Sequence, residues 1–268
     1  MSSSPAATPQ PGQRAAHEPV LRGARVAEGV RRFDDGIVNW YLVEDGDRLA
    51  LIDAGFPADW SMFATALGTL DRSPSDLAAV VLTHAHVDHL GFAERARREC
   101  GAEILVHAAD QRLAESPTTI AESERSPLRY LRHAATRRLM LQATLALAPL
   151  AKGISKATTF ADGETLEWVP GRPRAIHTPG HTDGHCALHM PERGVLFTGD
   201  ALVTRDPYTG ATGPRTVAAA ATKDTARARA SLDALERVEA DVLLAGHGEP
   251  WHGGVAEAVR LARLAKRA

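Results

Sequence analysis

The stretch Thr83-His84-Ala85-His86-Val87-Asp88-His89 places three histidines and an aspartate within one short turn of the chain. A buried strand, predicted over 79–83, leads into this stretch, and a helix predicted over 92–100 follows it. Side chains at such a strand-to-helix turn can point into a shared space. Without a cation, these ionisable groups would repel one another and lose solvation. Because imidazole and carboxylate ligands suit zinc, iron or manganese, the stretch predicts a metal site.

The same stretch indicates more than one metal position. Asp88 and His89 fall at the start of the predicted helix and are expected to face away from His84 and His86. Four residues cannot complete two sites that keep positions open for water, so other strand ends must supply ligands. Three candidates follow an apolar strand and a glycine, which lets the backbone turn sharply at the sheet rim: His181 after Gly180, Asp200 after Gly199, and His247 after Gly246.

The rest of the chain alternates short apolar runs with amphipathic segments. The runs 37–43 and 48–53 flank an Asp-Gly pair and predict a hairpin. Strands followed by strand–helix alternation occur twice, which indicates two β-sheets flanked by helices and built from two similar halves. Residues 111–156 have helical spacing and are expected to form an insertion over one end of the sheets. The other expected strands are 104–107, 165–169, 174–177, 186–190, 195–198 and 241–245, and the other expected helices are 59–70, 223–239 and 255–266.

Composition narrows the class of protein. The 268 residues carry a formal net charge of −2, which favours neither nucleic acid nor an anionic membrane as a partner. No apolar run approaches the roughly 18 residues of a membrane helix, and two cysteines exclude a disulfide scaffold and indicate a reducing compartment. We therefore expect a cytoplasmic protein. Residues 1–19 are expected to be a disordered tail before a single domain over 20–268.

The order His-x-His-x-Asp-His over 84–89, then His181, Asp200 and His247, resembles the metallo-β-lactamase superfamily. The stretch Asp53-Ala54-Gly55 and the stretch 178–185 (TPGHTDGH) are also similar to motifs of that family. The resemblance runs from about residue 25 to about residue 250. It implies an α/β fold, the αβ/βα four-layer sandwich, with metals at one edge between the sheets.

The resemblance also implies a cofactor of two divalent ions, zinc first, with iron or manganese as alternatives. Asp53 has the position of a carboxylate that orients ligands without binding metal, although an ordinary turn aspartate is the alternative. His185 is expected to line the site or to pack rather than to bind metal. The implied ligand sets are His84, His86 and His181 for one ion, Asp88, His89 and His247 for the other, and Asp200 as the bridge.

Such a centre predicts a hydrolase for a small-molecule substrate. Two cations about 3.5–4 Å apart can hold a hydroxide at neutral pH, which is the expected nucleophile. Asp88 is expected to accept the proton of that water or to deliver one to the leaving group. The chemistry that follows is hydrolysis of an ester, thioester, lactone or amide.

Residues outside the ligand set bear on the subclass. Asp200 argues against a β-lactamase, since genuine β-lactamases of this fold generally lack an aspartate at the bridge. Only 21 residues follow His247, too few for the glutathione-binding domain of glyoxalase II, and the basic arm or second domain of the nucleases is not found. One group of lactonases has a tyrosine three residues after the bridge, where this chain has Val203. Tyr208 is the nearest phenol and is either a substrate contact or a plain loop residue.

Two other functional classes are compatible with the same fold. Persulfide dioxygenases of the same fold have a similar ligand sequence but bind one iron and are oxidoreductases, so a metal count discriminates them. A scaffold without catalysis is disfavoured because all seven candidate ligands are intact.

The insertion over 111–156 is expected to form a lid over the metals. Its Leu139, Met140, Leu145 and Leu147 are expected either to line a pocket for an acyl chain or aromatic group, or to pack against the core or a partner subunit of a homodimer. The arginines over 125–138 either meet an anionic ligand or form a solvated face.

Overall fold

The computed structural model describes residues 23–117 and 122–265, so the predicted tail over 1–19 lies outside the described residues. A seven-stranded sheet has the order β1-β2-β3-β4-β5-β6-β7, a four-stranded sheet has the order β13-β10-β9-β8, and β11 pairs with β12. The strands are β1 (Ala24–Ala27), β2 (Val30–Asp34), β3 (Asn39–Asp45), β4 (Arg48–Ile52), β5 (Leu77–Val81), β6 (Glu103–His107), β7 (Thr158–Phe160), β8 (Arg174–His177), β9 (Cys186–Met190), β10 (Val195–Gly199), β11 (Val203–Arg205), β12 (Thr212–Arg215) and β13 (Val242–Ala245).

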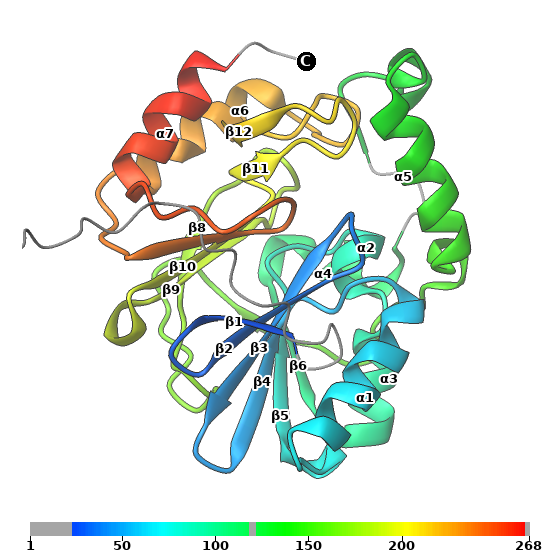
Figure 1. The fold of residues 1–268 in the computed structure, drawn as a ribbon, viewed down its shortest axis with the longest axis vertical. Coiled ribbons are helices and arrows are strands. Elements are labelled where there is room, and N and C mark those ends of the chain that lie inside the picture. Colours follow the sequence, from blue (N-terminus) through cyan, green and yellow to red (C-terminus); the bar gives the residue numbers. More distant parts are fainter. Residues whose placement is uncertain (1–22, 118–121, 266–268) are drawn as a thin grey trace, which may run out of the picture.

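Helices cover the outer faces of the two larger sheets, with α1 and α3 on one side of the molecule and α6 and α7 on the other (Figure 1). Helix α5 stands apart at the edge, near the end of the sheets that carries α2 and α4. The helices are α1 (Trp60–Thr69), α2 (Val87–Leu90), α3 (Ala93–Cys100), α4 (Gln111–Glu115), α5 (Ala134–Leu145), α6 (Thr225–Ser231) and α7 (Val255–Leu264).

Alternating side chains of the strands build three apolar layers. In β3, Leu42 packs toward α1 and α3, whereas its neighbour Tyr41 packs toward the second sheet, where its ring lies 5.1 Å from that of Phe197. In β10, Leu196 faces the opposite way, into a third cluster with Val259 of α7. The predicted αβ/βα four-layer sandwich is therefore confirmed, although sheets of seven and four strands make the two halves unequal.

Most of the predicted elements are present. The predicted hairpin is formed by β3 and β4, which pair antiparallel. The predicted strand over 165–169 is wrong: Thr165 forms an isolated bridge with Arg174, and the chain then turns, with Val169 N–H donating to the Leu166 carbonyl. Leu166 and Val169 are three residues apart and both are buried, so a turn explains this apolar run better than a strand. Sequence analysis missed β1, β2, β7, β11 and β12.

Two predicted helical segments are shorter than expected. The helix over 223–239 ends as α6 at Ser231, and tighter turns continue it, with the N–H of Leu235 bonded to Leu232 and that of Val238 to Leu235. This three-residue spacing matches a 3₁₀ turn better than an α-helix. Within 111–156, only α4, α5 and two 3₁₀ turns (Pro127–Tyr130 and Ala148–Leu150) are helical among the described residues. Over the described parts of the chain, no helix is both long and apolar enough to cross a membrane.

Candidate metal centre

The seven predicted ligands gather where the carboxyl ends of strands from both larger sheets meet. Strand β5 runs parallel to β4, and β10 runs parallel to β13, so residues that follow these strands emerge at one edge. Among the described residues, three groups have possible ligand atoms within 4.8 Å of one another: His84, His86 and His181; His84, His89 and Asp200; and Asp88, His89 and His247.

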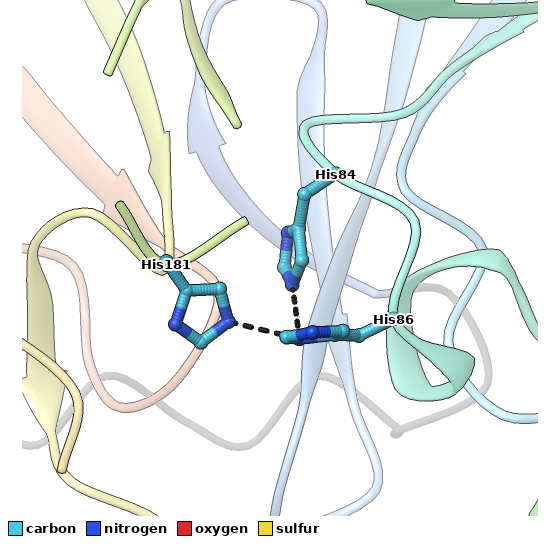
Figure 2. Close-up of side chains that lie close together, drawn as sticks. All are labelled: His84, His86 and His181. Atoms are coloured by element: carbon cyan, nitrogen blue, oxygen red, sulfur yellow. Dashed lines mark hydrogen bonds between the residues drawn. The ribbon is translucent and has the colours of Figure 1, made fainter. Parts of the chain in front are cut away.

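The first group consists of three buried imidazoles that point toward one another (Figure 2). His86 Nδ1 lies 3.1 Å from His84 Nε2 and 2.9 Å from His181 Nε2. The Thr83 hydroxyl donates to Asp53 at 2.8 Å, so it can only accept from His84 Nδ1, 3.1 Å away. His84 Nδ1 therefore carries the ring proton, and its Nε2 offers a lone pair.

The same logic applies to His181. The Thr222 hydroxyl donates to the Val217 carbonyl at 3.1 Å and so accepts from His181 Nδ1, 3.4 Å away. The lone pairs of His84 Nε2 and His181 Nε2 then both face His86 Nδ1, which carries at most one proton. A cation among the three nitrogens would satisfy all of them.

The second group contains a buried nitrogen that has no partner. His89 Nδ1 donates to Asp53 Oδ2 at 2.8 Å, so in the neutral ring, the form that binds metal, Nε2 offers a lone pair. Among the described residues, that Nε2 has no hydrogen-bond partner, and neither does Asp200 Oδ1, 3.6 Å away. Asp88 Oδ2 lies 3.8 Å from the same nitrogen. Two unpaired, buried acceptors that face each other are costly unless a cation lies between them.

Asp200 links the first group to the third. Its Oδ2 lies 3.4 Å from His181 Nε2 and 3.2 Å from His247 Nε2. His247 Nδ1 donates to the Ile37 carbonyl at 2.7 Å, so its Nε2 also offers a lone pair. The donor set of neutral imidazoles and carboxylates therefore fits divalent cations, and Asp200 lies within reach of both sides of the cluster.

The pKa shifts of the histidines in the cluster agree with the binding of cations there. Burial opposes charge on His89, yet the carboxylates Asp88, Asp53 and Asp200 outweigh it and raise its pKa to about 10. Burial likewise opposes charge on His247, and the carboxylates raise its pKa to about 9. The carboxylate side of the cluster therefore attracts positive charge, which protons supply when no metal does.

Burial has the opposite result on the histidine side of the cluster. It holds the pKa of His84 and His181 well below the usual range, and neighbouring imidazoles add to the effect. Both rings therefore stay neutral, which is the form that binds metal.

Asp53 and His185 hold the ligands in place. Asp53 has a left-handed backbone (φ 61°) and accepts bonds from Thr83 N–H and from His89, so it connects the end of β4 to the histidine turn. His185 Nε2 accepts from Asp200 N–H at 2.9 Å and Ala201 N–H at 3.2 Å, and burial lowers its pKa to about 3. It packs beneath the Asp200 turn.

Sequence analysis missed Asp110. Its buried carboxylate accepts from Ala85 N–H at 3.2 Å, from the Thr182 hydroxyl at 2.6 Å and from Gly184 N–H at 2.6 Å. It therefore joins the loop that carries His84 and His86 to the loop that carries His181. Asp110 follows β6, so the rule that ligands lie at strand ends could have found it.

The predicted glycines have two different roles. Gly180 and Gly199 have positive φ values of 129° and 46°, as a sharp turn requires. Gly246 has no such backbone, but a Cβ there would collide with Asp200 Oδ1 and lie 2.8 Å from His89 Cε1. Glycine is needed at position 246 for space beside the ligands.

A pocket of about 380 Å³ opens onto the candidate ligands. Tyr208 lines it, as do Leu139, Met140 and Ala143 from α5. Leu145 and Leu147 do not line it and are 70% and 45% exposed. The pocket-lining alternative therefore fits Leu139 and Met140, whereas Leu145 and Leu147 meet solvent and pack against no core cluster of the described residues.

The fold and the cluster define a protein with a candidate metal centre at its strand ends, and sequence comparison identifies the family. The profile of the metallo-beta-lactamase superfamily matches residues 33–247, so the chain belongs to that superfamily.

Individual relatives are more distant. The "Probable metallo-hydrolase YflN" of Bacillus subtilis is 27% identical over 249 residues, which cover 86% of this chain and 88% of the relative. A hydroxyacylglutathione hydrolase of Cereibacter sphaeroides is 28% identical over 137 residues, which cover 51% of this chain and 38% of the relative. A solved metallo-beta-lactamase family protein of Thermus thermophilus superposes with a TM-score of 0.64 at 26% identity, over 88% of this chain and 79% of that one.

Proposed function

We propose that this protein is a hydrolase that uses two divalent metal ions, zinc first, to cleave an ester, thioester or lactone bond of a small molecule. The observation that carries the proposal is the pair of unpaired buried atoms, His89 Nε2 and Asp200 Oδ1, at the junction of the ligand groups. The names of the Bacillus and Cereibacter relatives, a metallo-hydrolase and an acylglutathione hydrolase, support the reaction class.

The residues of the cluster have separable roles in this reaction. When bound, the two cations supply Lewis acidity and an acidic water for attack at neutral pH. His84, His86 and His181 would hold one, Asp88, His89 and His247 the other, and Asp200 would contact both. Of the candidate ligands, Asp88 has a carboxylate that is 20% exposed and lines the pocket. It is therefore the group placed to accept a proton from water or to pass one to the leaving group.

The direct test combines a metal count with hydrolysis. Purified protein is analysed for bound metal, then assayed on lactones, thioesters, aryl esters and phosphodiesters with zinc, manganese or iron added. We expect two metals per chain and zinc-dependent hydrolysis of a carboxylic ester, thioester or lactone. Asp88→Asn should lower kcat by about 10²–10⁴-fold, whereas Asp47→Asn, at an exposed loop position, should not change it.

The outcomes separate the candidate functions. One iron per chain with oxygen consumption on a persulfide would replace the proposal with the dioxygenase alternative. A protein that binds no metal, or one whose hydrolysis is indifferent to chelation, would overturn it.

A further inference from the structure

The pocket that opens onto the candidate ligands is mainly apolar and has no basic side chain except histidine among the described residues that line it. Beyond the ligands, apolar side chains dominate its wall, among them Phe56, Leu139, Met140, Ala143 and Val217. Its titratable side chains are candidate ligands and Tyr208, and none of the described residues that line it is lysine or arginine. An anionic group in this pocket would lose solvation and gain no counter-ion there other than bound metal.

A second, smaller pocket lies next to the first and differs in character. The two share Leu139, Pro207 and His247, so they meet beside the candidate ligands. The smaller pocket is lined by Arg138, from the same helix as Leu139, and by Arg205, which ends β11. Residues of helix α5 thus line both an apolar pocket and a smaller cationic one beside the candidate ligands.

The two guanidinium groups are available to a ligand. Within residues 23–117 and 122–265, neither forms an ion pair with a carboxylate. Arg138 Nε donates to the neutral amide oxygen of Gln142 at 2.9 Å, and among the described residues the Arg205 side chain has no hydrogen-bond partner. By contrast, Arg137 on the same helix is occupied by the Leu131 carbonyl at 2.7 Å. Two free guanidinium groups beside one opening match a carboxylate or another small oxyanion.

We propose that the substrate is amphiphilic, with an apolar group in the larger pocket, an anionic group beside Arg138 and Arg205, and the scissile bond between them at the candidate metal ligands. This inference rests on the proposed function for the bond cut. The inference specifies an amphiphilic substrate. It also assigns substrate specificity to the residues on the two sides of α5.

The first test uses esters with an n-alkyl chain on one side of the bond and a carboxylate on the other, in both orientations. Matched compounds carry a neutral amide in place of the carboxylate. In at least one orientation, kcat/KM should rise about fourfold per methylene until the pocket is full. Replacing the carboxylate by the amide should lower it about tenfold or more.

Variants on the apolar side test the larger pocket. Met140→Lys places a charge on the lining and should lower kcat/KM for long-chain esters about tenfold while leaving an acetyl ester within about twofold. Leu141→Lys is the matched control, because Leu141 is the adjacent residue, is 61% exposed and does not line the pocket. Equal effects of the two substitutions would overturn this half of the proposal.

Variants on the cationic side test the smaller pocket. The double change Arg138→Gln with Arg205→Gln should abolish the preference for the carboxylate over the amide. Arg129→Gln, at an exposed position of the same insertion, should preserve it. A preference that survives the double change would overturn the role of these arginines.

A binding measurement separates this proposal from the proposed function. N-acylglycines have an apolar chain and a carboxylate but no ester, so their calorimetric binding does not depend on ester hydrolysis. Binding that tightens with chain length and weakens in Met140→Lys and in the arginine double variant supports the amphiphile even if no ester is cleaved. Zinc-dependent hydrolysis of acetyl esters without any chain-length or carboxylate effect would leave the hydrolase intact and overturn the amphiphile.

Discussion

The ligand cluster and helix α5 face each other across one pocket, yet they are built by opposite means. In the cluster, buried partners hold several of the rings, because Thr83 accepts from His84, Asp53 from His89 and Thr222 from His181. Helix α5 has a single buried residue, Thr136, which donates to the Tyr208 carbonyl at 2.7 Å. Reaction chemistry needs fixed geometry, whereas substrate choice tolerates a wall that can vary. We therefore expect substitutions in the ligand cluster to lower kcat by orders of magnitude more than substitutions in α5.

The largest effect should come from Asp200. Asp200→Ala removes the carboxylate that lies between His181 on one side and His89 and His247 on the other, and we expect kcat to fall on the order of 10³-fold. Metal analysis should show fewer than two ions per chain. An Asp200→Ala protein that keeps both metals and near-normal turnover would contradict the expected contrast between the ligand cluster and α5.

A smaller loss should follow from Asp53→Asn, which weakens the bonds to His89 and Thr83 without removing a ligand. We expect metal affinity, measured by competition with a chelator, to fall about 10–100-fold. The matched control is Asp71→Asn, an exposed position with a similar left-handed backbone (φ 55°). If both variants lose affinity equally, backbone strain and not ligand orientation is responsible.

Acid should destabilise the metal-free protein because the ligand cluster contains the buried, neutral ring of His185. Burial lowers the pKa of His185 to about 3, so the folded form stays neutral while the unfolded chain takes up a proton below about pH 6.5. This group therefore leaves the free energy of unfolding unchanged above about pH 6.5. As the pH falls from there toward 3, it lowers the free energy of unfolding by up to about 1.4 kcal/mol per pH unit. Thermal unfolding in chelator between pH 7 and pH 4 measures this loss. A transition temperature that holds constant over that range would contradict it.

The smallest effect is expected on the outer face of α5. Leu145 is 70% exposed, so Leu145→Gln should change the free energy of unfolding by less than about 0.5 kcal/mol. Chemical denaturation, with the mass in solution measured in parallel, checks this. A homodimer formed through this face would instead show a larger loss together with dissociation, and the outer face would then belong to an interface.

The strand ends were the most predictable part of the fold. Short apolar runs followed by glycine and an ionisable residue located the ends of β8, β10 and β13. The amphipathic segments were less predictable, since the three-residue spacing of Leu232, Leu235 and Val238 suits a 3₁₀ turn as well as a helix. The short strands β1, β7 and β11 carry little periodicity of their own and depend on neighbouring strands to form.

The sequence by itself determined the family, the four-layer fold and the set of residues proposed to bind metal, because these depend on residue type and on position after a strand. Only the tertiary structure decided the rest. It brought Asp110 beneath two loops, set the tautomers of His84 and His181 through threonine hydroxyls, and turned Leu139 and Arg138 toward neighbouring pockets of opposite character. These features depend on distances between segments far apart in the chain, and local pattern does not encode such distances.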